Sequence, residues 1–156
     1  MKPFTKAVLI TTLIAGTLDI LSAYVHVYIL TGHISKTMFN YIASGALGPV
    51  ESMKEGWGVI IMGIFFHYFI AFAFTLFFFL IYRKLKIGSI NKYIAGVLYG
   101  LFVWLVMNQI VLPLSMLPAR PFNLKNAIIG ALILIFMIGL PISISAHNYF
   151  KKRNIF

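Results

Sequence analysis

The chain contains no cysteine, and only three of its 156 residues are acidic. The absence of cysteine excludes disulfide bonds, thiolate metal sites and cysteine nucleophiles. Charged residues of both signs make up 10% of the sequence, against about a quarter in a typical soluble domain. Hydrophobic residues make up 61%, and the mean hydropathy is +0.95. This composition excludes an ordinary soluble protein and predicts a membrane protein.

Four apolar runs are long enough to cross a membrane. Each exceeds the roughly 20 residues that a helix needs to span the hydrocarbon core. No shift in composition, linker or repeat divides the chain, so we predict one all-helical domain over residues 1–156. The expected fold is a polytopic bundle of four transmembrane helices. The predicted spans cover residues 7–30, 57–82, 93–117 and 126–147.

The net charge of +10 is distributed unevenly between the two ends of these spans. Nine of the 13 basic residues lie before the first span, between the second and third spans, or in the tail. The other four lie in the remaining two connections. By the positive-inside bias, this division predicts that both termini are cytoplasmic. We interpret the charge as a signal of topology in a lipid bilayer and expect no nucleic-acid binding.

Residues 1–17 also have features of a cleavable signal peptide. Lys2 and Lys6 precede an apolar run, and small residues at 15–17 would suit a cleavage site. However, the run continues to Leu30, beyond the about 7–15 residues of a signal-peptide core. We therefore expect a retained first helix.

The connection between the first two spans holds an apolar segment, residues 36–48, that is too short to cross the membrane. Such a length is typical of an interfacial or re-entrant helix. Two alternatives are open. The segment either lies flat on the outer surface or partly plugs the mouth of the bundle.

Asp19 lies near the middle of the first span, with no cation close to it in sequence. A charged side chain at this depth is costly and usually faces a bundle interior or a water-filled cavity. At ~1.5 Å of rise per residue, His67 lies roughly 3–4 Å to the outer side of the middle of its own span. Asn108 lies about 4–6 Å outward from the middle of the third span, and His26 lies about 11 Å outward from the middle of the first span.

These depths suggest a polar pocket that opens to the outer side. Its candidate ligand-binding residues are Asp19, His67, His26, Asn108 and Ser44. We hypothesise a protonation-sensitive hydrogen bond between Asp19 and His67. The alternative is that Asp19 is structural, held by Ser22, Thr12 or the backbone, and that His67 only packs within the bundle.

Small residues recur at helical spacing in every span. Such stripes allow close approach of helices where no hydrophobic force drives their association. Pro141 should distort the last span, because proline lacks an N–H and crowds the preceding turn. The glycines predicted at helix contacts are Gly16, Gly63, Gly96 and Gly100.

No pattern in the chain indicates catalysis. A catalytic zinc site usually has three protein ligands and an open position. The chain offers four histidines and three acids, without an HExxH motif. Ser44 and Ser115 lack a flanking nucleophile motif. We therefore predict no metal and no cofactor, and we do not expect an enzyme.

Four motifs together sample the chain from the first span to the end of the third. They are AGTLDI at 15–20, YIASGALG at 41–48, HYFIAF at 67–72 and VLPLS at 111–115. On these motifs, the chain resembles a family of small, uncharacterised bacterial membrane proteins with four helices. The resemblance implies a multi-pass protein of the inner membrane and implies no biochemical role.

Two functions are left open by these observations. The first is a permease-like or small-ligand-binding protein with its pocket around Asp19 and His67. A chain of this size would need a homo-oligomer to enclose a transport pathway. The second is a non-catalytic accessory subunit that binds a larger membrane partner through its small-residue faces.

Overall fold

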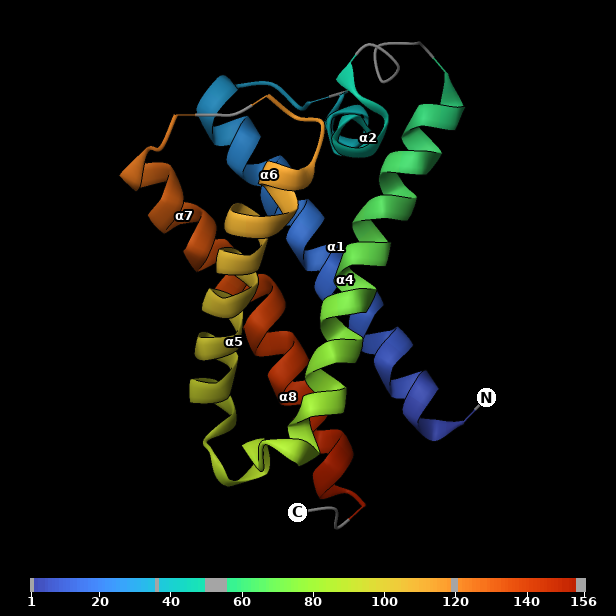
Figure 1. The fold of residues 1–156 in the computed structure, drawn as a ribbon, viewed down its shortest axis with the longest axis vertical. Coiled ribbons are helices and arrows are strands. Elements are labelled where there is room, and N and C mark those ends of the chain that lie inside the picture. The colour runs from blue at the N-terminus through green and yellow to red at the C-terminus, as the bar shows by residue number, and fades with distance from the viewer. Residues whose placement is uncertain (1, 36, 50–55, 119–120, 154–156) are drawn as a thin grey trace.

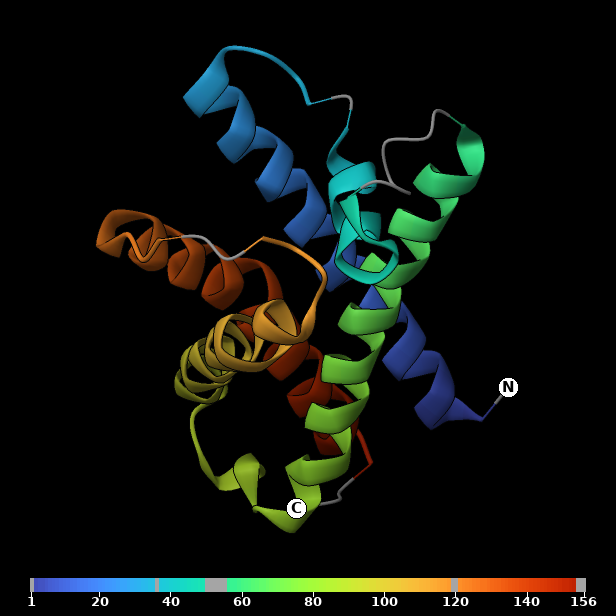
Figure 2. The same ribbon diagram turned by 45° about the horizontal axis from the view of Figure 1, so that its top comes forward.

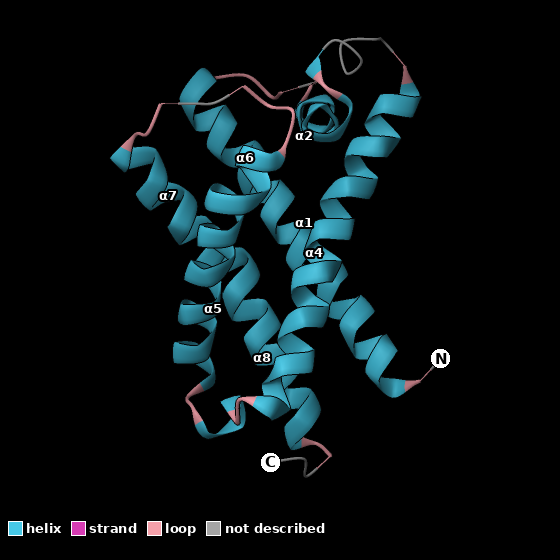
Figure 3. Ribbon diagram, in the orientation of Figure 1, coloured by secondary structure: helices cyan, strands magenta, loops and turns pink. Residues whose placement is uncertain are grey.

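A computed structural model describes residues 2–35, 37–49, 56–118 and 121–153. Within these ranges every regular element is a helix, as Figure 3 shows. A 3-10 turn, η1 (Ile87–Ser89), and two π-helical turns, η2 (Met107–Val111) and η3 (Ile135–Gly139), interrupt the α-helices. The α-helices are α1 (Pro3–Thr31), α2 (Met38–Leu47), α4 (Trp57–Lys84), α5 (Lys92–Val106), α6 (Leu112–Leu114), α7 (Leu124–Leu134) and α8 (Leu140–Lys151).

Four helical segments are long and apolar enough to cross a membrane, which confirms the predicted fold class. They cover Pro3–Thr31, Trp57–Lys84, Lys92–Leu114 and Leu124–Lys151. The short helix between the first two spans is α2, and Lys36, at the start of the predicted segment, lies outside the described residues.

The third span ends at Leu114, three residues before the predicted end at residue 117. Ser115 adopts an extended conformation there, with φ −78° and ψ 164°. Its hydroxyl donates to the carbonyl oxygen of Leu112 and accepts from the backbone N–H of Leu117. These local bonds replace the helical ones and stop the helix.

The bundle has two distinct ends, which Figure 1 separates vertically. Both termini and the α4–α5 connection lie at the lower end, and α2 and the α6–α7 connection lie at the upper end. Figure 2, in which the upper end comes forward, shows α2 lying across this end between α1, α4 and α6. Of these helices, α2 packs most closely against α4.

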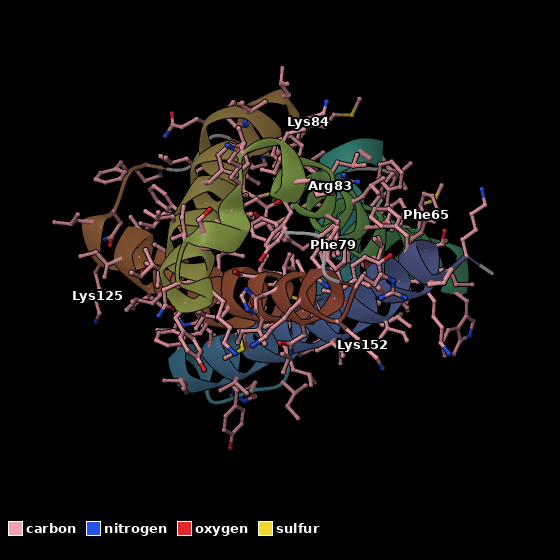
Figure 4. All side chains as sticks on the ribbon, turned by 90° about the horizontal axis from the view of Figure 1, so that it is seen from below. Phe65, Phe79, Arg83, Lys84, Lys125 and Lys152 are labelled. Carbon is pink, nitrogen blue, oxygen red and sulfur yellow. The ribbon has the colours of Figure 1, made fainter. Side chains whose placement is uncertain are left out.

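Aromatic side chains fill the lower half of the bundle. Phe78, Phe79 and Tyr82 of α4 are at most 2% exposed, and the ring of Tyr82 stacks on Phe150 of α8 with centroids 4.8 Å apart. Figure 4 looks into the bundle from below and shows Phe79 towards the centre of the view. This half of the molecule is therefore tightly closed.

Where α5 crosses η3 and α8, the backbones of the helices lie close together. A Cβ atom at Gly100 would stand 2.5 Å from the Cα atom of Ile135, and one at Gly96 would stand 2.7 Å from Cδ2 of Leu140. Gly139 of η3 faces the backbone of both α5 glycines. Glycine is required here because any side chain would push the two helices apart.

The other two predicted packing glycines lie against α4 and α2. A Cβ atom at Gly16 of α1 would stand 3.0 Å from the ring of Tyr68. Gly63 of α4 faces the backbone carbonyl of Phe39, so α2 rests directly on the α4 backbone. All four glycines thus lie at contacts within the bundle.

Both π turns precede a proline by two residues. The η2 turn ends at Val111, before Pro113, and η3 ends at Gly139, before Pro141. Proline cannot donate the helical hydrogen bond, and its ring crowds the carbonyl four residues earlier. A wider turn relieves that crowding, so the distortion predicted at Pro141 takes the form of a π turn.

Candidate ligand-binding cavity

A cavity of about 640 Å³ lies between the spanning helices, beneath α2. We call it the central cavity. Residues of α1, α2, α4, α5 and η2 line it, together with α6, the segment after α6, α7 and η3. The volume falls within the about 300–1,000 Å³ typical of small-molecule sites. Both π turns contribute to its wall, so the proline-induced distortions shape the cavity.

Asp19 and His67 both line the central cavity, and both side chains are half-buried. An electrostatic interaction links the Asp19 carboxylate to the His67 ring. Nε2 of His67 donates to the backbone carbonyl oxygen of Gly16, at 2.8 Å. Because a carbonyl oxygen can only accept, Nε2 carries the proton. The structure therefore brings the two residues into one cavity from neighbouring helices.

The hydrogen bond predicted between Asp19 and His67 is not formed within the described residues, where Nε2 of the imidazole donates to Gly16. Gly16 lies one turn before Asp19 and lacks a Cβ, which lets the backbones of α1 and α4 approach here. A second bond next to it, 2.8 Å between the hydroxyls of Thr17 and Tyr68, fixes the same contact. The Asp19 carboxylate is left facing the cavity.

Neither proposed structural partner holds the Asp19 carboxylate. The hydroxyl of Ser22 donates to the backbone carbonyl of Asp19 rather than to its side chain. The hydroxyl of Thr12 is buried and makes no hydrogen bond in the described part of the chain. Within that part, the carboxylate accepts no hydrogen bond, and it is open to the central cavity.

The other three candidate residues do not line the cavity. Asn108 donates through Nδ2 to the carbonyl oxygen of Trp104, at 2.8 Å. Ser44 donates to the carbonyl oxygen of Tyr41, at 2.6 Å, and is 4% exposed. His26 lies half-buried on α1, nearly two turns beyond Asp19. Asn108 and Ser44 thus satisfy their polar groups within their own helices.

The α2 helix covers part of the upper end of the cavity, as in the partial-plug alternative. Met116 donates its backbone N–H to the carbonyl oxygen of Gly45, at 2.9 Å, which ties α2 to the segment after α6. Sequence reasoning named Ser44 as the α2 residue of the pocket and missed the residues that line it. Their i, i+3, i+4 spacing in the sequence could have identified them as one helix face. The α2 residues in the wall are Met38, Tyr41, Ile42, Gly45 and Ala46.

Below the cavity, aromatic side chains close the space between α4 and α5. The hydroxyl of Tyr99 donates to the carbonyl oxygen of Phe74, at 2.6 Å. The buried rings of Phe78 and Tyr99 meet there, with centroids 4.5 Å apart. Since Phe74 also lines the cavity, this layer forms its floor.

The mouth of the cavity lies at its upper end, between α2 and the η2–α6 segment. Most lining residues are buried or half-buried, and the exposed ones all come from these two elements. They are Tyr41, Ala46, Ile110, Leu112 and Leu114.

The cavity wall carries a carboxylate and little other charge. Within the described ranges, Asp19 is the only acidic side chain, and no lysine or arginine lines the cavity. Apart from Asp19, His67, Tyr41 and Ser115, the lining side chains are apolar. The same described ranges contain no group of three histidine or acidic side chains placed to hold a metal ion.

No protein family, curated protein or solved structure matches this chain. The resemblance to small bacterial membrane proteins therefore stays a prediction. The function has to be argued from the geometry of the central cavity.

Proposed function

We propose that the protein is a multi-pass protein of the bacterial inner membrane that binds a small ligand in the central cavity, in a permease-like or ligand-binding role. One observation carries this proposal. Asp19 and His67, from two different helices, line the same cavity of about 640 Å³.

The state of the Asp19 carboxylate supports a functional role. A structural acid at membrane depth is expected to be paired or hydrogen-bonded, because an unpaired charge there is costly. Asp19 accepts no hydrogen bond from the described residues, and its electrostatic partner, His67, donates its Nε2 proton to Gly16 instead. A bound ligand would supply the missing partner.

The proposed orientation places both termini in the cytoplasm. Figure 4 shows Arg83, Lys84 and Lys152 around the lower end of the bundle, where the termini lie. The positive-inside bias favours this end on the cytoplasmic side. The mouth of the cavity then opens in the outer half of the membrane.

A cavity-filling variant tests this proposal. Ala23 lines the cavity one turn after Asp19, so Ala23→Phe would place a ring inside the cavity. We expect that small molecules that raise the Tm of the purified protein lose this effect in Ala23→Phe. The matched control is Leu21→Phe on the same helix, because Leu21 is 55% exposed and does not line the cavity.

The proposal fails if no compound in a broad small-molecule library stabilises the wild-type protein. It also fails if the same compounds stabilise the wild type and Ala23→Phe equally.

The accessory-subunit role has less support. It relies on small-residue faces that are free to bind a partner. Gly96 and Gly100 are instead packed against Leu140 and Ile135 of the same chain. A partner would have to bind through other surfaces.

A further inference from the structure

We propose that the ligand of the central cavity is an amine with an apolar body, whose ammonium group pairs with the Asp19 carboxylate. This inference rests on the proposed function of the cavity as a ligand-binding site. It adds the chemical class of the ligand and its route of entry.

Two of the four polar side chains in the cavity wall, Asp19 and His67, present hydrogen-bond acceptors to a ligand. Asp19 presents carboxylate oxygens. Because Nε2 of His67 donates to Gly16, the ring in its imidazole form offers only the lone pair of Nδ1, which is an acceptor. The hydroxyl of Ser115 donates to the carbonyl oxygen of Leu112 and is not a free donor. A ligand that matches these groups has to bring its own donors, and an ammonium group carries up to three.

The charge of the cavity also favours a cationic ligand. The chain as a whole has a net charge of +10, yet among the described residues the central cavity is lined by a carboxylate and by no lysine or arginine. An anion would be repelled by Asp19. A neutral alcohol would bring no charge to the carboxylate and would leave it with only the His67 ring as an electrostatic partner in apolar surroundings, which is costly. A cation both neutralises the carboxylate and gains a charge-assisted hydrogen bond.

The remainder of the wall matches an apolar body. Ile20, Phe66, Ile70 and Ile138 are among the side chains that surround the polar pair. Burying apolar ligand surface against them is favourable by roughly 25 cal/mol per Å². The ligand is therefore amphiphilic, with one charged end and a compact hydrophobic part.

The mouth of the cavity indicates how such a ligand enters. Its exposed rim on the η2–α6 side consists of Ile110, Leu112 and Leu114, all apolar. Leu114 is the last residue of the third span, so this rim lies at the level of the outer leaflet in the proposed orientation. At the other end of the cavity, the buried Phe78–Tyr99 layer forms the floor. An amphiphilic amine already dissolved in the outer leaflet would enter sideways between α2 and α6.

Three probes with one apolar body test the ligand class. Adamantylamine is cationic at neutral pH, adamantanol is neutral and adamantane carboxylate is anionic. Binding to the full-length protein is measured by calorimetry in nanodiscs of uncharged phospholipid, so that the lipid surface recruits no probe by charge. We expect the amine to bind more tightly than the alcohol and the carboxylate not to bind. This comparison needs no variant.

Substitution of Asp19 assigns the preference to the carboxylate. We expect Asp19→Asn to weaken amine binding by about thirtyfold or more, because truncating one partner of a buried charge pair has a large effect. The weak binding of the alcohol should not change. The matched control is Thr12→Val, which removes a polar group from the same helix outside the cavity and should leave both affinities unchanged.

The outcomes separate the two proposals. If the alcohol or the carboxylate binds at least as tightly as the amine, and Ala23→Phe abolishes that binding, the cavity is a ligand site and the amine inference is wrong. If the amine does not bind, or binds Asp19→Asn as tightly as the wild type, the amine inference is also wrong. The proposed function itself fails only by the library and Ala23→Phe test.

Discussion

Substituting Gly100 by alanine tests the backbone contact that holds the third and fourth spans together. The added Cβ would stand 2.5 Å from the Cα atom of Ile135 and 2.9 Å from its nitrogen. Both are backbone atoms and cannot move out of the way by a change of rotamer. Gly58, near the start of α4, offers a matched control, because a Cβ there meets no atom within 4 Å.

The expected magnitude follows from this geometry. Carbon atoms in contact normally lie about 3.5–4.0 Å apart, so α5 and η3 must separate by about 1 Å. A gap of about 0.5–1 Å loses a quarter to a half of the attraction of each contact. Overpacking of this kind typically costs about 1–3 kcal/mol. The gain in helix propensity, up to about 1 kcal/mol, applies to both variants. We therefore expect Gly100→Ala to be about 1–3 kcal/mol less stable than Gly58→Ala.

The measurement is reversible unfolding in mixed detergent micelles, followed by far-ultraviolet circular dichroism. The free energies of unfolding of wild type, Gly58→Ala and Gly100→Ala are compared in one detergent series. Equal stability of the two variants would refute the close crossing of α5 over η3.

Four further predictions follow from single side chains. Asp19→Asn should raise the free energy of unfolding without ligand by about 1 kcal/mol, since it removes a carboxylate that accepts no hydrogen bond from the described residues and serves binding rather than stability. Thr12→Val should also stabilise the protein, by about 1 kcal/mol, because the buried hydroxyl has no partner in the described structure. Tyr99→Phe should lower stability by about 0.5–1.5 kcal/mol through loss of its interhelical hydrogen bond. In the cysteine-free chain, a membrane-impermeant maleimide applied to intact spheroplasts should label Phe122→Cys but not Lys84→Cys.

Each of these four predictions has an outcome that would contradict it. A clear loss of stability in Asp19→Asn would indicate a structural carboxylate. A less stable Thr12→Val would mean that the hydroxyl has a partner, and an unchanged Tyr99→Phe would remove the role of its bond in closing the cavity floor. Labelling of Lys84→Cys but not of Phe122→Cys would invert the proposed topology.

The prediction of the spans succeeded because it depends on a local property. The length of an apolar run decides whether a helix can cross the membrane, whatever its neighbours are. The residues at which the spans end were less predictable from the sequence. The third span stops at Leu114 because Ser115 turns its hydroxyl onto the local backbone, and hydropathy contains no such information.

The candidate site was only partly predictable. The depth of Asp19 and His67 along their helices followed from helical rise, and the two residues do line one cavity. The depth of a residue along its helix does not specify which way its side chain faces, because that also depends on the rotation of the helix about its axis. Asn108 and Ser44 have suitable depth or position, yet each bonds to its own helix and lies outside the cavity.

The amino-acid sequence by itself determined that this protein is an apolar four-helix chain with one acid deep in its first span, because span length and composition are additive along the chain. Only the tertiary structure decided that His67 donates to Gly16 and leaves the Asp19 carboxylate open to a cavity partly covered above by α2. That outcome depends on how closely α1 and α4 approach at Gly16 and on where α2 rests on Gly63. Both are distances between segments far apart in the sequence, and they are set by the packing of the whole bundle.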